Sequence, residues 1–600
     1  MNRRQLLQST ASAALLVLAG TRGLAAAQRP AGRVRPGSPG WPSEAQWQGL
    51  SSEVGGRLQP VRSPLSQCAS GGSAADCAAL FQRLKNPYFI GDEPGLTQSL
   101  GWTDAWTSQP SVYAVAAEST AGVVAAVNFA RTHNLRVAVK GGGHSYQGTS
   151  NAPNSLLIWT RRMNAIRLHD DFVGQGCEGR AAPQPAVSIG AGAMWGQAYR
   201  EVAVRGGRYV QGGGCLTVGV AGLVQSGGFG SFSKGFGSAA ASLLEAEIVT
   251  ADGVVRIANS CTNPDLYWAL KGGGGGSFGV VTRVTLRTHD LPATVGAVFG
   301  DIQAATDEAW RALVGRVIDH YADTLFNPHW GEQLIFRSRR RLSLSMTFQG
   351  LDRGQAEAAW RDFFAWVNDG ANGCAFTAPP NILTIPARQF WDVEFLRTLP
   401  NVVLPDDRPG APPTNMFWAG NRGEAGQVLH GYQSAWLPQG LLAPAARGRL
   451  ADAIVAAAGQ WQIALHINKG LAGAPASAIA ATRDTATNPA ALDAFALVIC
   501  AAEEPPAWPG IAGHEPDVAR GRADAAAIER AMAPMRRVAP GAGSYVSESS
   551  YFERDWQRSF WGGHYPRLLA VKDRYDPDGL FIVHHGVGSE RWSADGFTRV

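Results

Sequence analysis

The sequence predicts an α+β protein with more than one lobe, and three observations support this fold class. The chain has 600 residues, whereas a single hydrophobic core stops growing near about 250–300 residues. With 45% hydrophobic and 17% charged residues, it has the composition of a globular protein. Along the chain, segments with helical periodicity alternate with short apolar runs that are typical of buried strands.

The first half of the chain contains a clear succession of these elements. Residues 121–134 have helical periodicity and end at Asn134, a residue that tolerates the left-handed conformation of a helix end. Buried strands are predicted over 135–140, 155–160, 186–192 and 244–258, the last with a hairpin turn at Asp252–Gly253. Residues 263–273 predict a helix with Asn263 as its cap and glycines at its end.

The central region has a different composition. Strands are predicted over 339–350 and 491–501, and helices over 356–369, 447–460 and 524–538. This region contains no phosphate-type glycine loops, which suits a substrate-binding domain. It is also rich in tryptophan, which either lines a sugar or aromatic site or packs in the core. These residues are Trp310, Trp330, Trp360, Trp366, Trp391, Trp418, Trp436 and Trp461.

Two nucleophilic side chains lie at the edges of glycine-rich loops. His144 follows Gly141–Gly143, and Cys215 follows Gly212–Gly214. Glycines permit positive φ and let backbone N–H groups approach an anionic pyrophosphate. Imidazole and thiolate are the side chains able to attack the electron-poor ring of a flavin. Each residue alone is equally consistent with a hydrogen-bonded loop histidine or a small buried cysteine, so the surrounding motifs decide.

Four stretches resemble, in order, the FAD-linked oxidases with a flavin domain of the vanillyl-alcohol-oxidase type, and among them the berberine-bridge-enzyme-like group. They are KGGGHSYQG at 140–148, GGGCLTVGVAGLVQSGGFGSFSKGFG at 212–237, CTNPDLYWALKGGGGGSFGVVTRVTL at 261–286 and FWGGHYPRLLAVKDRYDPDGLF at 560–581. The early segment WPSEAQWQGLSSEVGGRLQPV, 41–61, is similar to the longer members near isoamyl alcohol oxidase. The resemblance covers most of residues 41–590.

The resemblance implies a two-lobed PCMH-type FAD-binding domain, made of two α/β subdomains, and a substrate domain with an antiparallel sheet backed by helices. We expect an N-terminal extension over 28–107, the FAD-binding domain over 108–290 and the substrate domain over 291–535. A C-terminal berberine-bridge-like segment, 536–600, is expected to complete the FAD-binding domain.

The resemblance also implies a cofactor, FAD, bound covalently through His144 and Cys215. Val218 is expected to border the pocket where O₂ meets the reduced flavin, because a valine at this position is associated with oxygen access in the family. The remaining flavin-binding residues that the resemblance implies are Lys140, Gly141, Gly142, Gly143, Ser145, Gly148, Gly219, Gly222, Gly227, Gly228, Gly230, Gly279 and Val280.

Tyr545 occupies the place of the active-site Tyr-x-Asn of the family, although here the third residue is Ser547. A tyrosine acts as a base only if a cation or a donor lowers its pKa, and the candidate cations are Arg337, Arg339 and Lys469. Glu548 is an alternative base.

The function implied is oxidation of an alcohol or a carbohydrate hydroxyl by hydride transfer to the flavin, with O₂ reduced to H₂O₂. Two alternatives remain open: a dehydrogenase that passes electrons to a quinone or a protein, and a flavin-binding protein without turnover. The central domain carries no signature that names the substrate. The net charge of +5 is small and the arginines are scattered, so no nucleic-acid partner is expected.

Other motifs do not support rival functions. Gly274, Gly276 and Gly279 match G-x-G-x-x-G, but a helix precedes them and a strand follows, the reverse of a dinucleotide-binding Rossmann unit. His584 and His585 are adjacent, so they cannot share a metal as helical i, i+4 ligands do. The sequence contains no H-E-x-x-H or C-x-x-C motif.

The N-terminus resembles a twin-arginine signal peptide over residues 1–27. Arg3 and Arg4 precede a short apolar run, Ala13 to Ala19, and small residues near Ala25–Ala27 suit cleavage. We therefore expect passage through the Tat translocon and a periplasmic or secreted protein. We expect no stable membrane insertion, because the run is too short to span a bilayer. Residues 28–40 predict a flexible leader.

The cysteine content is odd, with seven residues. Export to an oxidising compartment permits disulfides, and Cys68 and Cys77 are close enough in sequence to pair. If Cys215 binds flavin, four cysteines remain whose pairing is left open: Cys177, Cys261, Cys374 and Cys500.

Overall fold

The computed structural model describes residues 32–600, so the predicted signal peptide lies outside the described residues. Residues 32–34 are packed, and the predicted flexible leader is wrong for this part. Arg33 is buried, donates a hydrogen bond to the Leu135 carbonyl at 2.9 Å and lies 4.6 Å from the ring centre of Trp592. Gly32 pairs with Thr598, so the start of the described chain is fastened to its end.

The first sheet is formed by β1 (Leu58–Pro60), β4 (Tyr113–Ala116), β6 (Ser155–Trp159) and β5 (Arg136–Lys140), in that order. Strands β4 and β5 are parallel to β6, and helix α5 (Thr120–Thr132) connects β4 to β5 and packs on the sheet. The predicted helix and strands in this region are confirmed, including the left-handed Asn134, with φ of 49°. This βαβ arrangement places the end of β5 directly before the His144 loop.

The second sheet is antiparallel. Its order is β11 (Val255–Asn259), β10 (Leu243–Val249), β12 (Val280–Arg287), β8 (Gln184–Gly190) and β7 (Ile166–Phe172). Helices α6 (Trp195–Tyr199), α7 (Val220–Gln225), α9 (Pro264–Leu270) and the C-terminal α18 (Tyr565–Tyr575) share its hydrophobic core. The predicted helix after residue 263 forms with Asn263 at its N-cap position, but the Asn263 side chain makes no capping hydrogen bond and donates to the Ile257 carbonyl at 2.7 Å.

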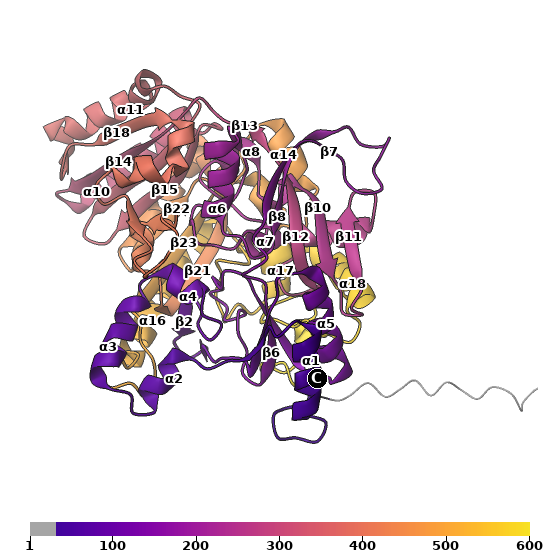
Figure 1. Cartoon of the computed structure of the whole chain (residues 1–600). Coiled ribbons are helices and arrows are strands. Elements are labelled where there is room, and N and C mark those ends of the chain that lie inside the picture. The colour runs from indigo at the N-terminus through magenta and orange to yellow at the C-terminus, as the bar shows by residue number, and fades with distance from the viewer. Residues whose placement is uncertain (1–31) are drawn as a thin grey trace, which may run out of the picture.

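The third sheet forms the second lobe; in Figure 1 its strands β14, β15 and β18 lie at the upper left, and β21 and β2 lie below them. Its order is β17 (Cys374–Phe376), β14 (Thr294–Ala304), β16 (Arg341–Gln349), β15 (Trp330–Arg337), β22 (Ile463–His466), β23 (Ala494–Glu504), β21 (Gln427–Pro438), β2 (Ser99–Trp102) and β3 (Trp106–Thr107), while β18 (Asn381–Pro386) pairs with β14. Every pairing is antiparallel except β2 with β21. Strands β2 and β3 come from the N-terminal part of the chain.

Four helices back one face of this sheet: α10 (Asp307–His320), α11 (Arg353–Asn368), α13 (Pro444–Ala458) and α16 (Val518–Val538). The strands alternate, so that Val298, Leu344 and Met346 point into the core under the helices and Ser345 and Thr347 point to the other face. The predicted α+β fold, with an antiparallel sheet backed by helices in the second lobe, is confirmed.

Shorter elements connect these lobes. Helices α1 (Glu44–Glu53), α2 (Pro64–Ala69), α3 (Ala74–Arg83) and α4 (Pro87–Gly91) precede β2. Further short helices are α8 (Ser233–Phe236), α12 (Val393–Arg397), α14 (Ala476–Arg483), α15 (Ala490–Asp493) and α17 (Trp556–Trp561). Two two-stranded ribbons pair β9 (Arg208–Tyr209) with β13 (His289–Asp290) and β19 (Val403–Pro405) with β20 (Met416–Trp418). Among residues 32–600, no helix combines the length and the apolar character needed to cross a bilayer.

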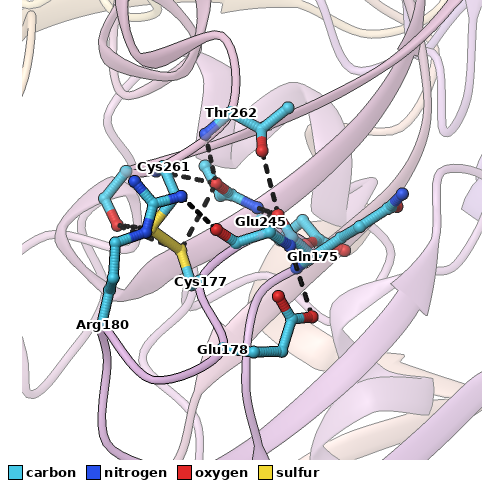
Figure 2. Close-up of a disulfide and its surroundings, with 10 residues drawn as sticks. Gln175, Cys177, Glu178, Arg180, Glu245, Cys261 and Thr262 are labelled. Atoms are coloured by element: carbon cyan, nitrogen blue, oxygen red, sulfur yellow. Dashed lines mark hydrogen bonds between the residues drawn. A yellow bond between two sulfur atoms is a disulfide. The ribbon is translucent and has the colours of Figure 1, made fainter.

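Two disulfides are present. The predicted Cys68–Cys77 pair is confirmed and joins α2 to α3. The second, between Cys177 and Cys261, fastens the loop after β7 to the end of β11, as Figure 2 shows. In the same loop the Gln175 N–H donates to the Glu245 carboxylate at 2.7 Å. Cys215, Cys374 and Cys500 are free, and the last two are buried.

Candidate functional site

A cavity of about 880 Å³ is lined by residues from both lobes and from the C-terminal segment. Its size is in the upper part of the range of ligand pockets, roughly 300–1,000 Å³. Three glycine-rich loops contribute to its wall: Gly141–Gly143, Gly213–Gly214 and Gly274–Gly276. Strands β14, β15, β16 and β18 of the third sheet contribute another part, and residues 545–548 and 581–586 complete it.

His144 and Cys215 both line this cavity. Their loops are in backbone contact, because a Cβ atom at Gly142 would lie 2.8 Å from the Gly219 nitrogen. The Thr217 hydroxyl lies 3.2 Å from Nε2 of His144. Burial lowers the pKa of His144 to about 4, so the imidazole is neutral near pH 7 and keeps a lone pair for attack. The two predicted nucleophiles are therefore brought together by the fold.

The Cys215 thiol is in a different electrostatic state. Burial raises its pKa, and the carboxylates of Glu424 and Glu332 raise it further, while the Lys469 ammonium acts in the opposite direction. The thiol is protonated at neutral pH, so its use as a nucleophile requires a proton acceptor. The two carboxylates line the same cavity.

Most of the predicted flavin-binding residues face this cavity. In addition to His144 and Cys215, those that line it are Gly141, Gly142, Gly143, Ser145, Val218, Gly219, Gly222 and Gly279. Those that do not line it are Lys140, Gly148, Gly227, Gly228, Gly230 and Val280.

Several of the residues outside the cavity wall have packing roles. A Cβ atom at Gly148 would lie 2.6 Å from the indole of Trp106, and one at Gly230 would lie 2.1 Å from the Gly212 carbonyl oxygen. Glycine is needed at both positions because neighbouring atoms leave no space for a side chain. Val280 is buried in the core between β12 and α5.

Lys140 is also buried away from the cavity wall. Its ammonium donates hydrogen bonds to the carbonyl oxygens of Glu93, Pro94 and Leu96, at 3.1, 2.7 and 2.9 Å. Burial lowers its pKa to about 7. The side chain therefore holds the turn after α4 against the end of β5, because a buried ammonium needs acceptors around it.

Tyr545 lines the cavity and is buried. Its phenol oxygen accepts a hydrogen bond from the Gly228 N–H at 3.1 Å. Burial raises the pKa of the phenol, and the Glu548 carboxylate raises it further. Of the three cations predicted to assist it, Arg337 and Arg339 do not line the cavity. The phenol is therefore protonated at neutral pH and suited to donate a hydrogen bond.

Lys469, the third predicted cation, forms an ion pair with Glu548 in the cavity wall. The Lys469 side chain is 8% exposed and that of Glu548 is 21% exposed. The ion pair holds the Glu548 carboxylate in the cavity wall, within reach of a ligand that brings a proton. The structure thus joins the predicted alternative base, Glu548, to a cation that the sequence could not assign.

Sequence reasoning missed two carboxylates in the cavity wall, Glu332 and Glu424. Burial raises the pKa of both, and that of Glu424 to about 7. Glu332 lies in β15 with a φ of 64°, in the left-handed region, and accepts a hydrogen bond from the Ser231 hydroxyl. Neither residue belongs to a motif, so no pattern in the sequence pointed to it.

The tryptophans of the central region divide between the two predicted roles. Trp310, Trp330 and Trp360 are buried in the core between the third sheet and its helices. Trp391 and Trp418 line the cavity, and the Trp418 indole donates to the Gly214 carbonyl at 2.8 Å, next to Cys215. Among the described residues, no cluster of three or more histidine, cysteine or acidic side chains is suited to a metal ion.

Two protein-family models match the chain. One, described as an FAD binding domain, matches residues 111–259, and the other, described as berberine and berberine like, matches residues 544–588. The FAD-linked oxidoreductase malF of Malbranchea aurantiaca is 30% identical over 589 residues, which cover 93% of this chain and 92% of the relative.

Solved structures are similar over most of the chain. The VAO-type flavoprotein MtVAO615 from Myceliophthora thermophila C1 matches with a TM-score of 0.76 and 26% identity, over 95% of this chain and 100% of that one. Glucooligosaccharide oxidase from Acremonium strictum shares the fold, with a TM-score of 0.61 and 18% identity over 83% of this chain and 95% of that one. The latter protein has a 6-S-cysteinyl, 8α-N1-histidyl FAD.

Proposed function

Because the chain belongs to the FAD-linked oxidoreductases of the VAO type, in the group with a berberine-like C-terminal segment, we propose that it is an oxidase with FAD bound covalently through His144 and Cys215. Its substrate is an alcohol or a carbohydrate hydroxyl, and its electron acceptor is O₂, which becomes H₂O₂. The observation that carries this proposal is that His144 and Cys215 line one cavity from two loops in backbone contact.

The residues present fit FAD. The glycine-rich loops in the wall offer backbone N–H groups to a pyrophosphate without side chains in the way. The neutral His144 imidazole and the Cys215 thiol would hold the cofactor, each link replacing one C–H bond of the flavin, with the two electrons released for each link passing to O₂; carboxylates beside Cys215 can take the thiol proton. When bound, FAD supplies the two-electron chemistry, accepting a hydride from the substrate and giving the electrons to O₂.

The protein's part in the reaction is to take the hydroxyl proton and to orient the substrate. We assign proton acceptance to a carboxylate oxygen of Glu548, which Lys469 holds in position through their ion pair. The protonated Tyr545 phenol, fixed by the Gly228 N–H, donates a hydrogen bond to the substrate oxygen. This reverses the order of the sequence-based candidates, because burial raises the pKa of Tyr545 and neither Arg337 nor Arg339 lines the cavity.

Export through the Tat translocon is also part of the proposal, with a periplasmic or secreted mature protein beginning near residue 28. Arg3 and Arg4 before the apolar run motivate it. The two disulfides support it, since disulfides persist in oxidising compartments.

The experiment that tests the proposed function combines two measurements on the purified protein. Acid precipitation should leave the yellow colour in the pellet, and oxygen consumption with peroxide release should follow the addition of a substrate from a panel of primary alcohols, aromatic alcohols and oligosaccharides. Colour released to the supernatant argues against the covalent links. Flavin reduction by a substrate without peroxide under air argues for a quinone or protein acceptor.

A further inference from the structure

On one face of the third sheet, the side chains of the strands that line the cavity are apolar at one end and polar at the other. The strand pairing places Leu383 of β18 opposite Ala297 of β14, and Ala297 opposite Thr347 of β16. In the next row, Phe299 of β14 lies opposite Ser345 of β16. All five side chains are on the face away from the helices, because they alternate with the core residues.

The apolar end of this face is open to solvent. Phe299 is 43% exposed and Leu383 is 44% exposed, and both line the cavity. Of the exposed large apolar side chains in residues 32–600, these two are the ones that belong to the cavity wall. An exposed apolar pair at the edge of a binding cavity indicates that an apolar ligand covers it.

Further apolar side chains continue this surface along the segment after β18. Phe390 lies 5.8 Å from Trp418, measured between ring centres, and both line the cavity together with Leu399 and Val402. We name Phe299, Leu383, Phe390, Leu399, Val402 and Trp418 the apolar mouth.

The other end of the same face offers hydrogen-bonding groups. Oγ1 of Thr347 and Oδ1 of Asn468 are buried and have no hydrogen-bond partner within the described chain, and both residues line the cavity. Asn468 is 3% exposed. A buried polar atom without a partner is costly, so these atoms are suited to a ligand that brings its own polar group.

We propose that the substrate is an amphipathic alcohol, with an apolar tail or ring of several carbons, rather than a free sugar. Its apolar part lies on the apolar mouth, and its hydroxyl reaches the polar end of the cavity. The assignment of the hydroxyl rests on the proposed function, whereas the apolar part rests on the composition of the cavity wall. A free sugar would bring hydroxyl groups to the apolar mouth, where the indole N–H of Trp418 already donates to the Gly214 carbonyl.

The test uses ligands that bind without reacting. Tertiary alcohols have no hydrogen on the carbinol carbon and cannot give a hydride, so their affinity is independent of turnover. For a series with linear tails of increasing length, titration calorimetry of the intact flavoprotein should show Kd falling by about fourfold for each added methylene. Cellobiose and maltose should show no binding at the same concentrations.

Matched variants locate the effect. In the double variant with Phe299→Ser and Leu383→Ser, each added methylene should lower Kd by less than about twofold. The control is Val255→Ser, since Val255 is 44% exposed on β11 and does not line the cavity, and it should retain the full dependence. Equal dependence in all three proteins, or tight binding of cellobiose, overturns the proposal. The proposal is also overturned if the wild type sediments as a dimer, the double variant sediments as a monomer, and the affinities for the tertiary alcohols do not change.

Primary alcohols with the same tails separate this inference from the proposed function. If they fail to reduce the flavin while the tertiary series keeps its dependence on tail length, the oxidation of alcohols is wrong and the apolar ligand class stands. If they reduce the flavin but affinity does not depend on the tail, the oxidation stands and the inference about the apolar mouth is wrong.

Discussion

The phenol oxygen of Tyr545 accepts a hydrogen bond from the backbone N–H of Gly228 at 3.1 Å, across 317 residues of sequence. Two residues that the sequence assigned to different tasks, catalysis and flavin binding, therefore act on each other. The contact fixes the tyrosine in the cavity wall and gives the glycine loop a partner in the C-terminal segment.

The first prediction compares two candidate bases. Tyr545→Phe removes one hydrogen-bonding group, and flavin reduction by substrate should slow by about tenfold. Glu548→Gln removes the proton acceptor, and reduction should slow by roughly 10²- to 10⁴-fold. Anaerobic stopped-flow spectroscopy measures both rates. A larger loss in Tyr545→Phe than in Glu548→Gln would return the base role to the tyrosine.

The second prediction concerns the covalent links. With His144→Ala the flavin should stay attached through Cys215, and with Cys215→Ala it should stay attached through His144, because each bond forms from its own loop. The double variant should release all of its flavin on acid precipitation. Fluorescence of the denatured protein band in a gel gives the readout. Complete loss of attachment in either single variant would show that the other residue is not a linker.

The third prediction concerns oxygen. Val218 lines the cavity and lies three residues after Cys215, so Val218→Leu adds a methylene to a packed wall next to the proposed link. Reoxidation of the reduced flavin by air-saturated buffer should be fast in the wild type and slower in the variant, while the reductive step and the attachment stay largely unchanged. Wild-type reoxidation over many minutes would favour another electron acceptor, and equal rates would exclude Val218 as the gate.

The fourth prediction concerns pH. Burial raises the pKa of Glu424 to about 7, above the usual value of 4.5, so the folded protein favours the protonated carboxyl. The protonated Glu424 carboxyl makes its full contribution to the free energy of unfolding below about pH 4.5, and this contribution is lost as the pH rises through 7. Glu424→Gln should therefore stabilise the protein near pH 8, by up to about 3 kcal/mol, with a difference that fades toward pH 5.

Melting temperatures of the wild type and of Glu424→Gln across this pH range test the fourth prediction. Glu394→Gln provides the matched control, because Glu394 is exposed and does not line the cavity. A Glu424→Gln effect that does not change with pH would contradict the prediction.

The fifth prediction concerns export. Replacement of both Arg3 and Arg4 by lysine should leave the protein in the cytoplasm, since the twin-arginine pair is what the translocon recognises. Fractionation of the cells followed by detection of the protein measures this. Unchanged export of the double variant would reject the twin-arginine route.

Local features of the sequence were enough to predict the helix and strands before His144 and the glycine-rich loops that bear His144 and Cys215. The helix that ends at Asn134, the strands around it and the glycines before His144 depend on neighbours in the chain, so their residue types predict them. The Cys68–Cys77 pair was predictable for the same reason, as the two lie only nine positions apart in the sequence.

Packing between segments far apart in the chain decided which side chains meet in the cavity wall. Lys140 lies in a glycine-loop motif, but three carbonyl groups from residues 93–96 surround its ammonium, because a buried cation goes where acceptors are. The ion pair of Lys469 with Glu548 joins residues that are 79 positions apart, and no pattern near either residue predicts it.

The sequence by itself determined the fold class, the family resemblance and the positions of His144 and Cys215. Three features of the site depended on the register of strands far apart in the chain. They are the contact between the His144 and Cys215 loops, the carboxylates around the Cys215 thiol and the position of the apolar part of the cavity. Phe299 and Leu383 become one surface through the pairing of β14 with β18, a contact between segments about 80 residues apart. Side-chain alternation is a local property, but which strands lie next to each other is set by burial of the whole core, and this can be read only from the tertiary structure.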